Sequence, residues 1–158
     1  MAALALPGPG ERRAENPAAA IAQQLPVDHL FTMRLQLSPY SVIPDGPHGS
    51  RVFCAILGGT AVGSRLNATV RPGGADWVTL RASGVSRLDV RLLLEADDGA
   101  LILMEYGGIY NRAGASGPRS APLFHASDPR YSWLNDVQAV GIGTPAEDAV
   151  TYEVYALR

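Results

Sequence analysis

The amino-acid sequence predicts an all-β fold, an antiparallel barrel or sandwich of about eight to ten strands. Three observations support this. Short apolar runs, several alternating with polar residues, recur along the whole chain. Turn residues separate these runs, with 17 Gly and 12 Pro among 158 residues, and no long amphipathic pattern of helical period interrupts them. The length is that of one ordinary domain with a single core.

Composition and charge exclude several classes of protein. The chain is 47% hydrophobic and 18% charged, which is typical of a folded domain. Its net charge is −2 and its arginines form no basic cluster, so we expect no nucleic-acid partner. No apolar run approaches the roughly 18 residues of a membrane span, so we expect no membrane partner. The single cysteine, Cys54, excludes an intrachain disulfide, which favours a cytoplasmic location.

The first strand is predicted to start at Val27. Residues 1–26 are rich in Ala, Pro and charge, and we expect a mobile N-terminal extension there, with residues 27–158 forming the barrel domain. Apolar residues then alternate with other residues from Phe31 to Leu37, the period of a strand with one buried face. The proline- and glycine-rich residues 38–50 follow as a loop.

The middle of the chain is predicted to form five strands after that loop. RVFCAILGGTAVG is a strand ending in Gly58-Gly59, and two further strands flank the turn Pro72-Gly73-Gly74. Residues 85–110 form a long hairpin, with a type I′ turn at Asp98-Gly99. In its first strand, the apolar residues at even positions 88 to 94 share one face.

The last third of the chain is predicted to begin with a polar loop over residues 111–122. Residues 123–143 form a strand, a turn at Asp128-Pro129 and another strand. Residues 149–157 close the chain as a strand that places Val150 and Tyr152 on the same face. Several strands are apolar on both faces, which a barrel with a packed or ligand-holding interior explains.

Motifs with strong chemical signatures are absent from the sequence. It contains no phosphate-binding loop, no G-x-S-x-G elbow and no dinucleotide-binding G-x-G-x-x-G. The three histidines, His29, His48 and His125, lie far apart without the spacing of metal ligands. We therefore expect neither a metal nor a cofactor.

Polar residues inside apolar strands are the remaining candidates for chemistry: Asp76, Asp89, Arg91, Glu105 and Tyr106. One interpretation is structural, with Asp89 and Arg91 as an ion pair on an exposed face and Glu105 at a fraying strand end. The other interpretation is functional: these residues form a site in which burial shifts the pKa values of the carboxyl groups. The strand period leaves both open.

Four stretches of the sequence resemble the DUF3237 family, also called UPF0311: GPHGSR, GGTAVGSRLNATVRPGGADW, RLDVRLLLEADDGALI and DPRYSWLN. The resemblance covers the chain from Val27 to its end, and the order of PGGADW before DDGA is fairly specific. It implies a lipocalin-like, calycin-like antiparallel β-barrel, which agrees with the strand count.

The resemblance implies less about function. Most members of the family have no assigned activity. Some fungal members act in polyketide or meroterpenoid pathways, where one type catalyses intramolecular hydroalkoxylation, which implies a cofactor-free cyclase. The sequence departs from the family pattern at Ser64, where a Pro is typical, and at Ala68, where a Gly is common. His125 stands where an acid is more frequent, which implies a different reaction, a different substrate or no catalysis.

Ether closure needs a proton donor in a dry cavity. If Asp76 faces inward, it is the general acid or base, with Asp89 or Arg91 tuning it and Glu105 as a second carboxylate. If Trp77 faces inward instead, Asp76 holds the turn through backbone N–H groups. Neighbours in a strand point to opposite sides, so both alternatives stay open. The expected substrate-binding residues are Arg51, Trp77, Tyr106, His125, Trp133 and Asn135.

Three functions follow as hypotheses. The first is an enzyme, a cyclase, isomerase or lyase that acts on a hydrophobic polyketide- or terpenoid-like substrate in secondary metabolism without a cofactor. The second is a barrel that binds an apolar small molecule without changing it. The third is a structural homo-oligomer that buries its doubly apolar strands against a second copy of the chain.

Overall fold

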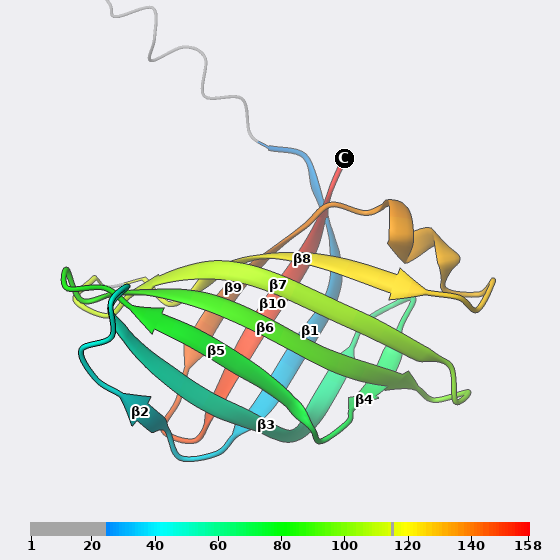
Figure 1. Ribbon diagram of the computed structural model, residues 1–158. Coiled ribbons are helices and arrows are strands. Elements are labelled where there is room, and N and C mark those ends of the chain that lie inside the picture. Colours follow the sequence, from blue (N-terminus) through cyan, green and yellow to red (C-terminus); the bar gives the residue numbers. More distant parts are fainter. Residues whose placement is uncertain (1–24, 115) are drawn as a thin grey trace, which may run out of the picture.

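The computed structural model describes residues 25–114 and 116–158 (Figure 1). The extension predicted over residues 1–26 lies, apart from its last two residues, outside this part of the chain. The elements of the described residues are β1 (Val27–Leu37), β2 (Ser41–Ile43), β3 (Ser50–Val62), β4 (Asn67–Val70), β5 (Gly74–Leu80), β6 (Val85–Ala96), β7 (Leu101–Asn111), β8 (Arg119–Ala126), the 3-10 helix η2 (Ser132–Asp136), β9 (Ala139–Pro145) and β10 (Ala149–Leu157).

The strands form a closed antiparallel barrel, as predicted. The circuit runs β1-β10-β9-β8-β7-β6, and β6 then pairs with both β4 and β5. Both of these pair with β3, and β3 pairs with β1 to close the ring. The short strand β2 adds to β3 beside the barrel. Figure 1 shows the long strands wrapping around a common interior.

Strand β3 runs through Gly58-Gly59, so the prediction that it ends there is wrong. Its first half pairs with β5 from Ser50 to Ile56, and its second half pairs with β4 from Gly59 to Val62. Both glycines have a φ of 152°, a conformation that side chains disfavour. A Cβ on Gly59 would also overlap the carbonyl oxygen of Arg34 in β1. The glycine pair therefore lets one strand change partners while it lies close against β1.

The predicted strand faces are correct where the sequence alternates. The even-numbered residues from Leu88 to Leu94 in β6 are buried, as are Ile102, Met104 and Tyr106 in β7. Fully buried side chains fill the barrel near the β6–β7 turn, because Leu94, Ile102 and Leu134 have no exposed surface. The opposite end of the barrel is left less tightly filled, and the cavity lies there.

Four local predictions need correction. The β6–β7 connection has four residues, and within it only Gly99 has a positive φ, 86°, whereas a type I′ turn needs two such residues. The segment predicted as a loop before residue 51 contains β2, and β8 already begins at Arg119 inside the second predicted loop. The helix η2 occupies a segment where the sequence predicted a turn and a strand. All four are local features that depend on tertiary contacts.

Candidate functional site

A cavity opens to solvent at the end of the barrel far from the β6–β7 turn. Most of its lining is aliphatic, with Leu35, Ile56, Leu88 and Val90 among the contributing side chains. Its polar lining residues are Tyr40, Cys54, Asp76, Ser86, Tyr106, Tyr110, Arg112 and Tyr152. A mostly apolar pocket with a few placed polar groups is typical of a small-molecule site.

Asp76 points into this cavity and Trp77 points away from it. Asp76 in β5 is half-buried and lines the cavity, whereas the side chain of Trp77 is 50% exposed. The indole packs on the outer surface against Phe53 of β3, with ring centroids 4.6 Å apart. Because neighbours alternate along a strand, the inward carboxylate requires the outward indole.

The Asp76 carboxylate is held between two strands. The β5–β6 ladder pairs Asp76 with Val90 and resumes at Thr79 with Arg87. Between these pairs, the backbone N–H of Asp89 donates to Asp76 Oδ1 at 3.1 Å. Burial raises the pKa of Asp76 from 3.8 to about 6, the Asp89 N–H opposes this shift, and the Asp89 carboxylate adds to it. The carboxyl group can therefore both give and accept a proton near neutral pH.

Two buried tyrosines lie beside this carboxyl group. Tyr106 of β7 is 5% exposed and Tyr152 of β10 is 3% exposed, and their rings meet edge to face with centroids 5.5 Å apart. Burial raises both phenol pKa values, and the charge of Asp76 raises them further. Both phenols therefore stay protonated and can present hydrogen-bond donors and ring faces to a ligand.

Cys54 also lines the cavity, opposite Asp76 in the β3–β5 register. Its thiol donates to the carbonyl oxygen of Ser38 at 3.4 Å. Burial raises the pKa of this thiol, so it remains protonated and is a poor nucleophile.

The other predicted catalytic residues lie on the outer surface of the barrel. Arg91 bridges two carboxylates there, with its Nε 2.8 Å from Glu105 Oε1 and its Nη1 3.4 Å from Asp89 Oδ1. All three side chains are half-exposed or more. This placement corrects the expectation of a second inward carboxylate, because odd positions of β6 and β7 face solvent. Of these three residues, Asp89 acts on Asp76, through its backbone N–H at 3.1 Å and through the charge of its carboxylate, which helps to raise the pKa of Asp76.

Most of the predicted substrate-binding residues also lie outside the cavity. Arg51 is exposed and donates to Thr79 Oγ1 and to the carbonyl oxygen of Trp77, so it braces β5 from outside. His125 is exposed on the outer face of β8. Of the predicted binding set, Tyr106 lines the cavity.

Trp133 and Asn135 lie in η2, at the opposite end from the cavity mouth. Arg65 stacks over the Trp133 ring, with its guanidinium carbon 3.6 Å from a ring centroid. The side-chain amide of Asn135 binds both backbone groups of Ala126, at 2.8 and 2.9 Å, and so extends the end of β8. These residues attach η2 to the barrel instead of contacting the cavity.

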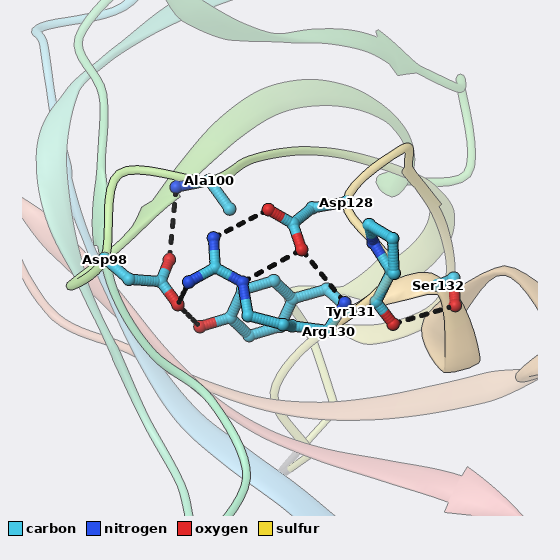
Figure 2. A network of polar contacts seen from close by, with 7 residues as sticks. Asp98, Ala100, Asp128, Arg130, Tyr131 and Ser132 are labelled. Atoms are coloured by element: carbon cyan, nitrogen blue, oxygen red, sulfur yellow. Dashed lines mark hydrogen bonds and ion pairs between the residues drawn. The ribbon is translucent and has the colours of Figure 1, made fainter.

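A polar network fastens the same end (Figure 2). Asp98 of the β6–β7 turn accepts a 2.7 Å hydrogen bond from the Tyr131 hydroxyl and pairs with Arg130 at 2.9 Å. Arg130 also pairs with Asp128 at 2.7 Å. The motifs ADDGA and DPRYSWLN, far apart in sequence, therefore contact each other here. Two of the stretches that carry the family resemblance thus build the closed end.

Arg130→Gln should raise the pKa of Asp128, which hydrogen bonds from Arg130 hold at about 2. Because that pKa is lowered in the folded state, its stabilising effect is present above about pH 4 and is lost as pH falls through 2. The melting temperatures of wild type and variant should therefore differ near neutral pH and converge in acid. Carboxyl NMR titration with thermal melts checks this, with Arg91→Gln as the control. An unmoved Asp128 pKa would contradict it.

Sequence reasoning missed several cavity residues. Tyr152 was placed on a shared face with Val150, a pattern that marks an inward position, but no role was assigned to it. Ser86 is buried at the start of β6. Tyr40 and Arg112 stand in segments predicted as loops, where periodicity carries no information about direction.

The arrangement can support proton transfer to a bound apolar molecule. Asp76 is the carboxylate that lines the cavity, and tyrosine rings surround the same space. Among residues 25–114 and 116–158, no three His, Cys, Asp or Glu side chains are grouped as metal ligands. No helix within these ranges is long and apolar enough to cross a membrane.

Comparison with known proteins agrees with the fold. A UPF0311 protein of Rhodopseudomonas palustris is 27% identical over 146 residues, covering 83% of this chain and 95% of that protein. Its crystal structure superposes with a TM-score of 0.79 at 26% identity, over 87% of this chain and all of that one. A beta-barrel like protein of Acinetobacter baumannii gives a TM-score of 0.76 at 28% identity, covering 87% and 99% of the two chains.

The chain is also similar to the hydroalkoxylation enzyme phnH of Penicillium herquei. It is 30% identical over 115 residues, which cover 73% of this chain and 72% of the enzyme. The sequence model of a family described as protein of unknown function, DUF3237, matches residues 25–157. With barrel, motifs and relatives in agreement, the chain belongs to the DUF3237 family.

Proposed function

We propose that this protein is a cofactor-independent acid–base enzyme that acts on a hydrophobic polyketide- or terpenoid-like small molecule and closes a cyclic ether by hydroalkoxylation. The observation that carries the proposal is a carboxyl group with a pKa of about 6 facing a mostly apolar cavity. The similarity to a hydroalkoxylation enzyme supports the choice of reaction.

In the proposed reaction, protonated Asp76 gives its proton to one carbon of a substrate alkene. The other alkene carbon becomes cationic, and the rings of Tyr106 and Tyr152, which line the same cavity, stabilise it. A hydroxyl oxygen of the same substrate forms the new C–O bond. Its proton passes to the Asp76 carboxylate, which restores the acid, so the reaction is an isomerisation.

The aliphatic lining serves this chemistry in two ways. It keeps water from capturing the cation, and it raises the pKa of Asp76 so that a useful fraction is protonated near pH 6. The paired tyrosines from β7 and β10 line the same cavity as Asp76 of β5. The substrate can therefore contact the acid and the aromatic faces together.

Asp76→Asn should lower the turnover of a test substrate such as 2-prenylphenol, which closes to 2,2-dimethylchroman, by about 10²–10⁴-fold because the proton donor is lost. Product formation by liquid chromatography and one deuterium incorporated from D₂O give the readout. Wild-type kcat/KM should fall about tenfold per pH unit above the Asp76 pKa of about 6.

Glu105→Gln is the matched control, because it makes the same acid-to-amide change on the outer surface. It should leave turnover unchanged. Equal losses in both variants would contradict the role of Asp76.

A second candidate function is a carrier that holds an apolar ligand without changing it, which the mostly aliphatic lining supports. The same experiment separates the two. A carrier would bind 2-prenylphenol in wild type and in Asp76→Asn alike and would release it without deuterium.

A further inference from the structure

The mouth of the cavity carries an arginine between two aromatic rings. The Arg112 guanidinium carbon lies 5.7 Å from the ring centroid of Tyr40 and 5.6 Å from that of Tyr110. All three residues line the cavity, Tyr110 from the end of β7 and the other two from the connections that follow β1 and β7. Arg112 is exposed to solvent, and its contacts with both rings hold the cation at the rim of the cavity that it lines.

The charge of Arg112 meets no carboxylate at short range. Within the described residues, each ion pair of an arginine involves Arg71, Arg91, Arg130 or Arg158, and Arg112 is not among them. The acidic residues of the nearby β9–β10 turn, Glu147 and Asp148, are exposed and do not line the cavity. The cavity thus has a cation at its mouth and a carboxyl group farther inside.

We propose that the ligand of this cavity is an amphiphilic acid, whose carbon skeleton lies among the aliphatic side chains while its carboxylate or ionised phenol pairs with Arg112 at the mouth. This inference rests on the proposed function and names its class of substrate. A planar guanidinium suits a carboxylate because it offers two parallel N–H donors. The mostly aliphatic lining of the cavity suits the carbon skeleton of such a molecule.

Such binding would also orient the substrate. The anionic group stays where water reaches the mouth, and the apolar end extends toward Asp76, Tyr106 and Tyr152. An alkene at that end then meets the proton donor, whereas the reversed orientation would bury a charge in the aliphatic region.

The test uses N-phenyl-1-naphthylamine as an uncharged fluorescent reporter of the cavity, displaced by either octanoate or 1-octanol. The two competitors differ in one end group on the same chain. Arg112→Gln should weaken octanoate binding about tenfold, as expected for one lost charge-assisted contact, and leave 1-octanol binding unchanged. Arg87→Gln, a loss of the same charge on the outer surface of β6, should change neither.

Ser86→Trp, which fills the cavity, should abolish reporter uptake in a variant whose folding is verified by circular dichroism. The inference is overturned if Arg112→Gln weakens both competitors equally, if it weakens neither, or if wild type takes up no reporter. Failure of the proposed function looks different. Octanoate would then bind through Arg112 as expected, while 2-prenylphenol and its carboxylated analogues are released unchanged.

Discussion

Asp76→Asn should stabilise the protein by about 2–3 kcal/mol at pH 8 and have almost no effect at pH 4. Burial raises the pKa of this carboxyl group from 3.8 to about 6, so the folded state holds its proton more tightly than the unfolded state. The favourable contribution of the group is therefore complete below about pH 4 and is lost as pH rises through 6. An amide accepts the same Asp89 N–H without becoming charged.

Urea denaturation of wild type and variant from pH 4 to pH 8 measures this difference in unfolding free energy. Glu105→Gln on the exposed surface should stay within about 0.5 kcal/mol of wild type throughout. A variant less stable than wild type at pH 8 would show that Asp76 holds the β5–β6 strands together as an anion. If Asp76→Asn is both more stable than wild type and inactive, Asp76 is a residue that serves function and lowers the stability of the fold.

Gly59→Ala should destabilise the barrel by about 3 kcal/mol or more, because the added methyl group has no room between two strands. The new Cβ would overlap the Arg34 carbonyl oxygen, and the backbone φ of 152° is itself unfavourable for alanine. Neither strand can move away freely, because Gly59 pairs with both Leu35 of β1 and Val70 of β4. Barrel closure depends on this contact.

Gly73→Ala is the matched control, and its unfolding free energy should fall by only about 1–2 kcal/mol. Gly73 also has a positive φ, 108°, but a Cβ there meets no atom within 4 Å. Denaturant midpoints of the two variants separate backbone strain from steric overlap. If both variants lose the same unfolding free energy, the positive backbone φ, and not the overlap with β1, causes the destabilisation.

Strand alternation made most of the fold predictable from the sequence. Long strands with one polar face, such as β1 and β6, show their period over seven or more residues, and the structure confirms their buried faces. The turns at Pro72-Gly73 and Gly99 are visible because glycine supplies the positive φ angles that they need. Where local preference and tertiary packing agree, residue types are sufficient.

The candidate site was predictable only in part. The period establishes that Asp76 and Trp77 face opposite ways, but it does not say which faces inward. Val78 and Leu80 share the parity of Asp76, and that was the available signal for its direction. The large indole suggested the opposite, because exposed tryptophan is uncommon.

Contacts between distant segments account for what the sequence left undetermined. Nothing near Tyr131 indicates that its hydroxyl meets Asp98 across 33 residues. In the same way, Arg112 acquires its place at the mouth from Tyr40, which arrives from another connection. Such pairs are brought together by closure of the barrel, which no local pattern specifies.

The opposed directions of Asp76 and Trp77 restrict how this barrel can evolve. Inserting or deleting a single residue within β5, with its pairing retained, would carry the indole into the cavity and the carboxylate out to solvent. Changes of two residues preserve the arrangement. Homologues in which β5 differs in length should therefore differ by an even number of residues. The connections around the cavity mouth are not restricted in this way, so they can vary in length and admit new ligands.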